Sequence, residues 1–282
     1  MDSWGSQGSD DGEFNTPVGI AVSDDDSLVL VADSLNDRIQ VFDSDGVFDE
    51  EFGTSGSDSG ELDRPRDIAL DSDDNVYVAD GDNHRISKFS DTFTFVRVWG
   101  SLGSDNAELR TPKGIAIDDS DFVYVADSVN DRIQVFDEDG DFIRSFGSSG
   151  TGDGEFDDPR GIAIGSGGDV YISDTANYDI TRMSTTGTFR SSWGSEGTGN
   201  GEFDRPRAVA IDDDGNVYVA DRENHRIQIF DATGTFLSRF GSQGTGNGEF
   251  DTPAGITVDS TGTLYVSDTD NHRIQKFTCV IP

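Results

Sequence analysis

The chain is poor in basic residues and in cysteine, and each shortage excludes a class of protein. Its 282 residues hold 20 Lys and Arg against 56 Asp and Glu, for a formal net charge of −36. Because contacts with phosphates need an excess of Lys and Arg, this balance argues against non-specific nucleic-acid binding. The one cysteine, Cys279, excludes an internal disulfide framework and a multi-thiolate metal site, and we expect a buried or merely tolerated thiol there.

Long apolar runs are also missing. No segment reaches the roughly 18 apolar residues of a membrane span, and the opening MDSWGSQGSDDGEF lacks the layout of a secretory signal. We therefore expect a cytoplasmic monomer without membrane contact, or an extracellular domain if the chain is a fragment of a longer protein. The acidic excess is tolerated best where salt screens it, which predicts a salt-adapted protein whose melting temperature rises with KCl.

What the chain does contain is one unit repeated six times. Six prolines and six aspartates recur at a spacing of 47 residues with one insertion, at Pro17, Pro65, Pro112, Pro159, Pro206 and Pro253, and at Asp33, Asp80, Asp127, Asp174, Asp221 and Asp268. Such a period indicates a solenoid, a propeller or an array. The six units fill residues 1–282, so we expect a single domain.

Each unit holds four short segments rich in β-branched and aromatic residues. In the third unit they are GIAID from Gly114, FVYVAD from Phe122, RIQVFD from Arg132 and FIRSFG from Phe142. Four-stranded meanders repeated about four to eight times around an axis form a β-propeller. The sequence therefore predicts an all-β, six-bladed β-propeller with four-stranded antiparallel blades.

The two ends of the chain are predicted to complete one blade together. An aromatic-glycine pair ends the fourth segment of five units, whereas the last unit stops after its third segment, and the sixth pair is Trp4-Gly5. Residues 1–5 should therefore supply the outer strand of the sixth blade and remove an exposed sheet edge.

These segments resemble the NHL repeat. Its pattern, Pro-x-Gly-Ile-Ala-Val, then Val-Tyr-Val-Ala-Asp, then Asn-His-Arg-Ile-Gln-Val-Phe, is matched by all six units, with Asn-His-Arg itself at 83–85, 224–226 and 271–273. The resemblance implies the six-bladed fold. Relatives include RNA-binding domains, receptor-kinase sensor domains, protein-interaction modules and a metal-dependent amidating lyase, and the fold does not choose among them. The metal-binding histidines that follow the repeat proline in that lyase are absent here.

The two faces of the disc should carry different charges, because the connections of a meander alternate between them. The turns after the first and third strands are rich in Asp, as in DSDDN from Asp71, and hold no Lys or Arg. On the other face, the residues after the six repeat prolines are, in order, Val18, Arg66, Lys113, Arg160, Arg207 and Ala254. We name Arg66, Lys113, Arg160 and Arg207 the basic arc.

Two interpretations of the basic arc remain open. The four cations can bind a protein partner or an anionic ligand at the mouth of the channel. Alternatively, they can pair with neighbouring loop aspartates, as the DRPR segments at Asp63 and Asp204 suggest.

Two patterns that hint at metal sites have simpler explanations. His84, His225 and His272 equal the ligand count of some catalytic zinc sites, but they occupy equivalent turns of three different blades and cannot converge on one ion. The Asp-rich turns lack the helices of a helix-loop-helix calcium site, so that hairpin turns and salt adaptation explain them, with weak cation binding left open. We predict no cofactor, no metal site and no catalytic residue.

These observations favour a non-catalytic binding module that uses the basic arc. A lyase- or hydrolase-like enzyme centred on the channel is the alternative. Single-stranded RNA binding at the same face is a third possibility, against which stand the charge and the lack of exposed aromatics beside the arginines. The recurring Asp, Asn and Arg side chains are interpreted as scaffold, since a catalytic group is needed only once. Blade four departs from the pattern at Tyr178 and Asp179, through function or through drift.

Overall fold

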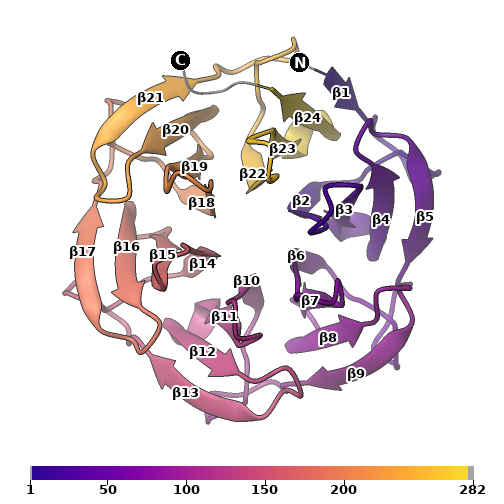
Figure 1. Ribbon diagram of the computed structural model, residues 1–282, viewed down its shortest axis with the longest axis horizontal. Coiled ribbons are helices and arrows are strands. Elements are labelled where there is room, and N and C mark those ends of the chain that lie inside the picture. The colour runs from indigo at the N-terminus through magenta and orange to yellow at the C-terminus, as the bar shows by residue number, and fades with distance from the viewer. Residues whose placement is uncertain (1, 279–282) are drawn as a thin grey trace.

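The computed structural model describes residues 2–278, which form six four-stranded antiparallel sheets around a central channel (Figure 1). In blade three, β10 (Pro112–Ile117), β11 (Val123–Asp127), β12 (Arg132–Phe136) and β13 (Phe142–Phe146) pair in chain order from the channel outwards. The predicted six-bladed propeller is confirmed. Cys279 lies outside the described residues.

The remaining blades repeat this arrangement. Blade one consists of β2 (Pro17–Val22), β3 (Leu28–Asp33), β4 (Arg38–Asp43) and β5 (Phe48–Phe52). Blade two consists of β6 (Pro65–Leu70), β7 (Val76–Asp80), β8 (Arg85–Phe89) and β9 (Phe95–Trp99). Blade four consists of β14 (Pro159–Ile164), β15 (Asp169–Asp174), β16 (Asp179–Ser184) and β17 (Phe189–Trp193). Blade five consists of β18 (Pro206–Ile211), β19 (Val217–Asp221), β20 (Arg226–Phe230) and β21 (Phe236–Phe240).

Blade six is built from both ends of the chain. Its strands β22 (Pro253–Val258), β23 (Leu264–Asp268) and β24 (Arg273–Phe277) are completed by β1 (Asp2–Trp4), which pairs antiparallel with β24. The Trp4 ring lies 5.9 Å from that of Phe42 in blade one and 6.3 Å from that of Tyr265 in blade six, and so joins the two blades. The predicted closure is confirmed for the described part of residues 1–5, which excludes Met1.

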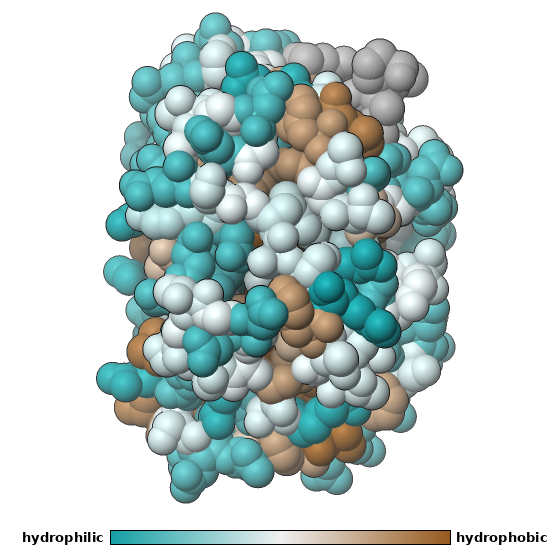
Figure 2. Space-filling model, turned by 90° about the vertical axis from the view of Figure 1, so that its left-hand side faces the viewer, coloured by the Kyte–Doolittle hydropathy of each residue, from teal (hydrophilic) through white to brown (hydrophobic). Residues whose placement is uncertain are grey.

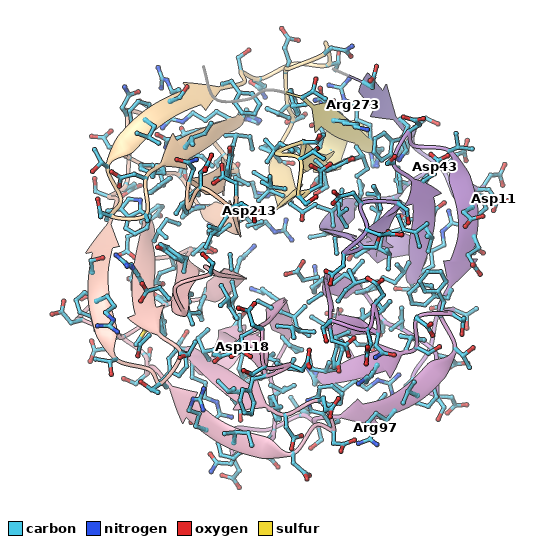
Figure 3. All side chains as sticks on the ribbon, in the orientation of Figure 1. Asp11, Asp43, Arg97, Asp118, Asp213 and Arg273 are labelled. Atoms are coloured by element: carbon cyan, nitrogen blue, oxygen red, sulfur yellow. The ribbon has the colours of Figure 1, made fainter. Side chains whose placement is uncertain are left out.

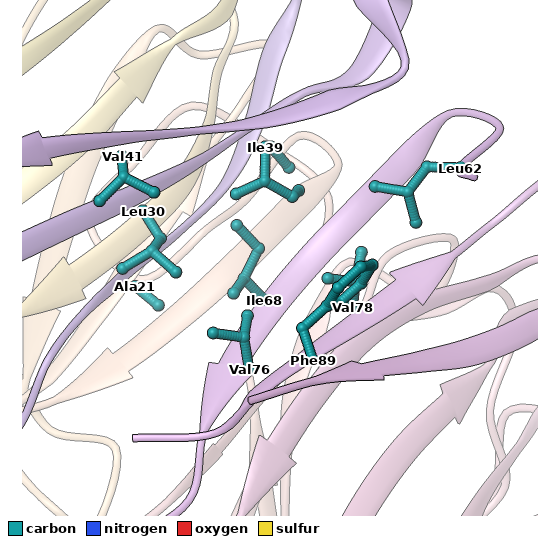
Figure 4. Close-up of a cluster of buried hydrophobic side chains, with 10 residues drawn as sticks. Ala21, Leu30, Ile39, Val41, Leu62, Ile68, Val76, Val78 and Phe89 are labelled. Atoms are coloured by element: carbon teal, nitrogen blue, oxygen red, sulfur yellow. The ribbon is translucent and has the colours of Figure 1, made fainter. Parts of the chain in front are cut away.

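The hydrophobic core lies between neighbouring blades. One cluster packs Leu30 and Ile39 of blade one against Ile68, Val76 and Phe89 of blade two (Figure 4). In each long loop the apolar residue that directly follows a glutamate is fully buried at such a junction: Phe14, Leu62, Leu109, Phe156, Phe203 and Phe250. Each contributes roughly 1.5–3 kcal/mol by leaving water, so the same plug stabilises every junction.

Short turns and a polar rim complete the disc. Three connections between the second and third strands contain a 3-10 turn, η1 (Ser34–Asn36), η2 (Ser128–Asn130) and η3 (Thr269–Asn271). Seen from the side, hydrophobic residues form small areas separated by hydrophilic ones (Figure 2). Within residues 2–278 there is no helix with the length and hydrophobicity to cross a membrane.

Candidate functional site at the channel mouth

The residues that follow the repeat prolines meet at one end of the channel. Each proline begins the innermost strand of its blade, and these strands surround the axis (Figure 1). One pocket is lined by all six of the following residues: Val18, Arg66, Lys113, Arg160, Arg207 and Ala254. The structure therefore brings the four members of the basic arc together at the mouth of the channel.

Glycine allows the innermost strands to approach one another so closely. A Cβ atom added at Gly114 would lie 1.8 Å from the Arg160 carbonyl oxygen, and one added at Gly255 would lie 1.9 Å from that of Val18. Neither position tolerates a larger side chain without backbone movement. The tight ring fixes the backbone from which the basic arc projects.

The loops at the mouth are held by strained residues and by side chains from the neighbouring blade. The residue before each repeat proline has a positive φ of 49–62° without being glycine: Thr16, Arg64, Thr111, Asp158, Arg205 and Thr252. In all of these residues except Arg205, the backbone N–H donates to a side chain in a turn of the preceding blade. The acceptors are His272 for Thr16, Asp37 for Arg64, His84 for Thr111, Asp131 for Asp158 and His225 for Thr252. This conformation is costly for a non-glycine residue, so it persists only because the surroundings impose it.

This arrangement gives the three histidines a scaffold role. The Nδ1 atoms of His84, His225 and His272 accept from backbone N–H groups at 3.0, 3.1 and 3.3 Å, each at a different blade junction. Within residues 2–278 no group of three or more His, Cys, Asp or Glu side chains is placed to hold a metal ion. The prediction that these histidines occupy separate turns is confirmed.

Three members of the basic arc have carboxylate partners. Arg66 donates to Asp82 at 3.2 Å, Arg160 donates to Asp158 at 2.8 Å, and Lys113 also contacts Asp158. The pairing expected from the DRPR segments therefore occurs, but not with Asp63 or Asp204. Arg160 pairs with a sequence neighbour, since Asp158 lies two residues before it. The partners of Arg66 and Lys113 are more distant in sequence, because Asp82 lies in a later turn of the same blade and Asp158 lies in the next blade.

Arg207 differs from the other three. Among residues 2–278 its guanidinium makes no hydrogen bond and no ion pair within 4.0 Å, although it is only partly exposed in the channel. Burial lowers the pKa of Arg207 well below its usual range, and Arg160, Arg222 and Arg66 lower it further. Burial and Arg160 also lower the pKa of Lys113, to about 8. In both groups, burial and the neighbouring cations outweigh the nearby carboxylate, which is Asp67 for Arg207 and Asp158 for Lys113.

Asp67 also lies in this pocket, although no motif in the sequence points to it. It occupies the position that is glycine in blades one, three, four and six and alanine in blade five. Its Oδ2 accepts from the Ile115 N–H at 3.1 Å. Burial raises the pKa of Asp67 to about 7, against the opposing effects of Ile115, Ile68 and Arg207. The one acidic residue among small ones was the signal that could have found it.

Beyond Asp67 the channel continues to an acidic end. Asp67 lines both the mouth pocket and a cavity of about 250 Å³ inside the ring. The opposite opening is lined by Asp24, Asp212, Asp213 and Asp259, and Figure 3 shows Asp213 beside it. The innermost strands pair on one side only, so their free N–H and C=O groups must find water in the channel.

The Asp-rich turns at the acidic end are hairpin turns, as predicted. The Asp71 carboxylate accepts from the Asn75 N–H at 2.9 Å and from the Tyr77 hydroxyl at 2.9 Å. Asp212 makes the same two contacts with Asn216 and Tyr218. Their carboxylates are thus occupied by their own hairpins.

Two family models match most of this chain. The family model described as "NHL repeat" matches residues 203–230 and 250–277, and the one described as "6-bladed beta-propeller" matches 8–99 and 72–184. A search of curated proteins finds no match.

Three solved structures have similar folds. A streptogramin B lyase is 16% identical over 98% of this chain and 96% of its own, with a TM-score of 0.69. A catalytically inactive virginiamycin B lyase from Staphylococcus aureus with quinupristin is 18% identical over 95% and 82%, with a TM-score of 0.67. A gluconolactonase from Xanthomonas campestris is 14% identical over 93% and 86%, with a TM-score of 0.71. At these identities the likeness concerns the fold alone, whereas the two family models together span most of the sequence, so this chain belongs to the NHL-repeat six-bladed β-propellers.

Proposed function

We propose that the protein is a non-catalytic binding module that holds an anionic group at the mouth of its channel. The group is a carboxylate, phosphate or sulfate, on a small ligand or on a protein partner. The observation that carries this proposal is Arg207, whose guanidinium has no acceptor among the described residues although the net charge of the chain is −36. Because the chain has 56 Asp and Glu residues, a shortage of carboxylates does not explain why the Arg207 guanidinium is unpaired.

The neighbouring side chains support the same proposal. Lys113 and Arg160 share the single carboxylate of Asp158, so each retains hydrogen-bonding capacity for an added anion. Arg207 and Arg160 belong to adjacent innermost strands, β18 and β14, whose spacing is fixed by the ring. A preformed site loses little conformational entropy on binding, so a few charge-assisted hydrogen bonds suffice for modest affinity.

The test is calorimetric titration of the protein with phosphate, sulfate and acetate in KCl at constant ionic strength. Arg207→Gln should weaken the binding of the best anion about tenfold or more, since a hydrogen bond to a charged group contributes about 1.5–3 kcal/mol. Arg190→Gln is the matched control, because Arg190 lies on the outer strand β17. Equal affinities for wild type, Arg207→Gln and Arg190→Gln would exclude the basic arc as the binding site.

Asp67 favours a second candidate, an enzyme of the lyase or hydrolase class centred on the channel. A carboxyl group with a pKa of about 7 in the pocket that Lys113 also lines suits general acid-base chemistry near neutrality. Two solved structures with this fold are named lyases and one a gluconolactonase. If a screen of lactones and B-type streptogramins finds turnover, Asp67→Asn should abolish it while anion binding persists. Turnover unaffected by Asp67→Asn would remove this candidate.

A further inference from the structure

Blade four lacks a cation that the other five blades hold at the same place. In each of those blades the arginine that begins the third strand donates from Nε to the buried aspartate that ends the second strand, at 2.6–2.9 Å. The pairs are Arg38–Asp33, Arg85–Asp80, Arg132–Asp127, Arg226–Asp221 and Arg273–Asp268. Each of these carboxylates is fully buried, so the guanidinium supplies the charge that would otherwise be missing.

Backbone oxygens of the preceding long loop surround the same guanidinium. In blade five, Arg226 donates to the carbonyl oxygens of Thr198, Gly199 and Glu202 at 2.7, 2.7 and 2.8 Å. Gln228, two residues further on, donates to the Glu202 carbonyl at 2.7 Å and to Asp221 at 3.0 Å. The loop and the aspartate together thus form an oxygen-lined site that holds a cation.

In blade four the side chains change, but the loop does not. Asp179 stands in the place of Arg226, and Thr181 in that of Gln228. The loop keeps its path, since the Gly150 N–H donates to the Phe156 carbonyl at 3.0 Å, as Gly197 does to Phe203 at 2.9 Å. The Asn177 side chain still donates to the Gly150 carbonyl at 2.8 Å, as Asn224 does to Gly197.

The loop oxygens of blade four have therefore lost their donors. The equivalents of the Thr198, Gly199 and Glu202 carbonyls are those of Thr151, Gly152 and Glu155. Among residues 2–278 none of these three oxygens accepts a hydrogen bond from a side chain, whereas each of their counterparts in blade five does. In the other five blades carbonyl oxygens of this loop help to hold a cation. Blade four has the same oxygens but, within the described residues, no cation among them.

Two carboxylates face each other at this place. Asp174, only 1% exposed, and Asp179 are directly opposed in the β15–β16 ladder. Asp174 accepts from the Asp157 N–H at 2.8 Å and from the Asn177 side chain at 2.7 Å, and Asp179 accepts from the Thr181 hydroxyl at 3.1 Å. Neither carboxylate forms an ion pair with a cation of residues 2–278, and like charges so opposed destabilise a sheet. Burial raises the pKa of Asp174 to about 7 and that of Asp179 to about 6.

We propose that blade four binds one Ca²⁺ ion between Asp174 and Asp179, in the place that an arginine guanidinium takes in the other five blades. The available donors are two carboxylates, the Thr181 hydroxyl and the loop carbonyls of Thr151, Gly152 and Glu155. An all-oxygen set of this size and charge matches the preference of Ca²⁺ for 6–8 oxygen ligands. The bound ion replaces the missing tether between β16 and the loop and neutralises the buried pair.

The experiment compares wild type with a variant that restores the repeat. EDTA-treated protein is dialysed into 1 M KCl and titrated with CaCl₂, with calorimetry and melting temperature as readouts. Wild type should bind one ion, and its melting temperature should rise by about 5 °C at one hundred times the Kd. Asp179→Arg with Thr181→Gln should weaken Ca²⁺ binding at least tenfold and should melt higher than wild type without Ca²⁺.

Two further variants keep the proposal falsifiable. Asp179→Asn removes one charge with little change in size, so it should also lose Ca²⁺ binding even if the arginine variant folds poorly. Asp213→Asn, on the acidic end of the channel, should bind like wild type and controls for ion uptake by the acidic surface.

Two results would overturn the proposal. One is an equal response of wild type and all variants to CaCl₂, which means adventitious binding to the acidic surface. The other is no saturable binding up to about 10 mM CaCl₂, beyond the Kd range of weak calcium sites, together with stabilisation by acid alone. That second result means that the two aspartates share a proton instead.

Discussion

Blades four and five have the same backbone and opposite electrostatics. Their second and third strands pair in the same register, Asp174 with Asp179 and Asp221 with Arg226. In blade five the buried carboxylate has a guanidinium partner, and in blade four it has a second carboxylate. The ring therefore dictates the path of each loop, while the charges inside each blade are set locally and can be changed one blade at a time.

The largest effect is expected from making blade five resemble blade four. Arg226→Asp leaves Asp221 buried without its partner and removes the three hydrogen bonds that Arg226 donates to carbonyl oxygens of the preceding loop. Breaking a buried ion pair on one side typically costs about 3–5 kcal/mol, and we expect a loss in this range without divalent cations. Urea unfolding monitored by tryptophan fluorescence measures it. Arg190→Asp, at an exposed arginine, is the control. If both variants lose an equally small free energy of unfolding, the Asp221–Arg226 pair is not what distinguishes blade five from blade four.

A pH effect of intermediate size should distinguish blade four. The pKa of Asp174 is raised to about 7 and that of Asp179 to about 6, whereas carboxyl groups of an unfolded chain titrate near pH 4. The folded protein therefore binds more protons between about pH 4 and pH 7, and its stability falls as the pH rises through this range. If folding raises the pKa of a carboxyl group by one, the free energy of unfolding is about 1.4 kcal/mol lower once that group is ionised.

The measurement is the free energy of unfolding at about pH 5 and pH 8 without divalent cations, for wild type and for Asp179→Arg with Thr181→Gln. The free energy of unfolding of the variant should exceed that of wild type by more at the higher pH than at the lower pH. Burial raises the pKa of Asp67 to about 7 in both proteins, so its contribution cancels in the difference. An advantage that does not change with pH would show that the carboxylate pair is not the cause.

The smallest effect concerns the junction between blades four and five. Tyr178 occupies the turn position from which a histidine or aspartate accepts the N–H of the strained residue before the next proline, here Arg205. Tyr178→His should supply that acceptor and stabilise the protein by about 0.5–1 kcal/mol, with Tyr178→Phe as the neutral control. Differential scanning calorimetry resolves such a shift. A histidine variant no more stable than the phenylalanine variant would remove the acceptor role.

Much of the fold could be predicted because the same sequence pattern recurs in six units. The period fixes the blades, the missing fourth segment of the last repeat fixes the closure by Trp4, and the repeat proline places Arg66, Lys113, Arg160 and Arg207 at one mouth. Whether that arc binds an anion stays a prediction, as does salt adaptation.

What the sequence could not provide is backbone chemistry. The partners of Arg226 are mainly carbonyl oxygens 24–28 residues upstream, which no residue pattern displays. For the same reason the change at Asp179 was visible in the sequence, but its consequence for the loop was not. Asp67 was overlooked because a single substitution in a glycine position looks like drift until its side chain is seen in the channel.

The pairing of β1 with β24 joins the ring by backbone hydrogen bonds rather than by a peptide link. Spatial order of the blades is thus independent of where the polypeptide is interrupted. A circular permutant opened in the long loop at residues 242–248 would move the non-covalent joint from blade six to the junction of blades five and six. Its mechanical weak point would move as well, so the same six sheets could be made to open from a different side.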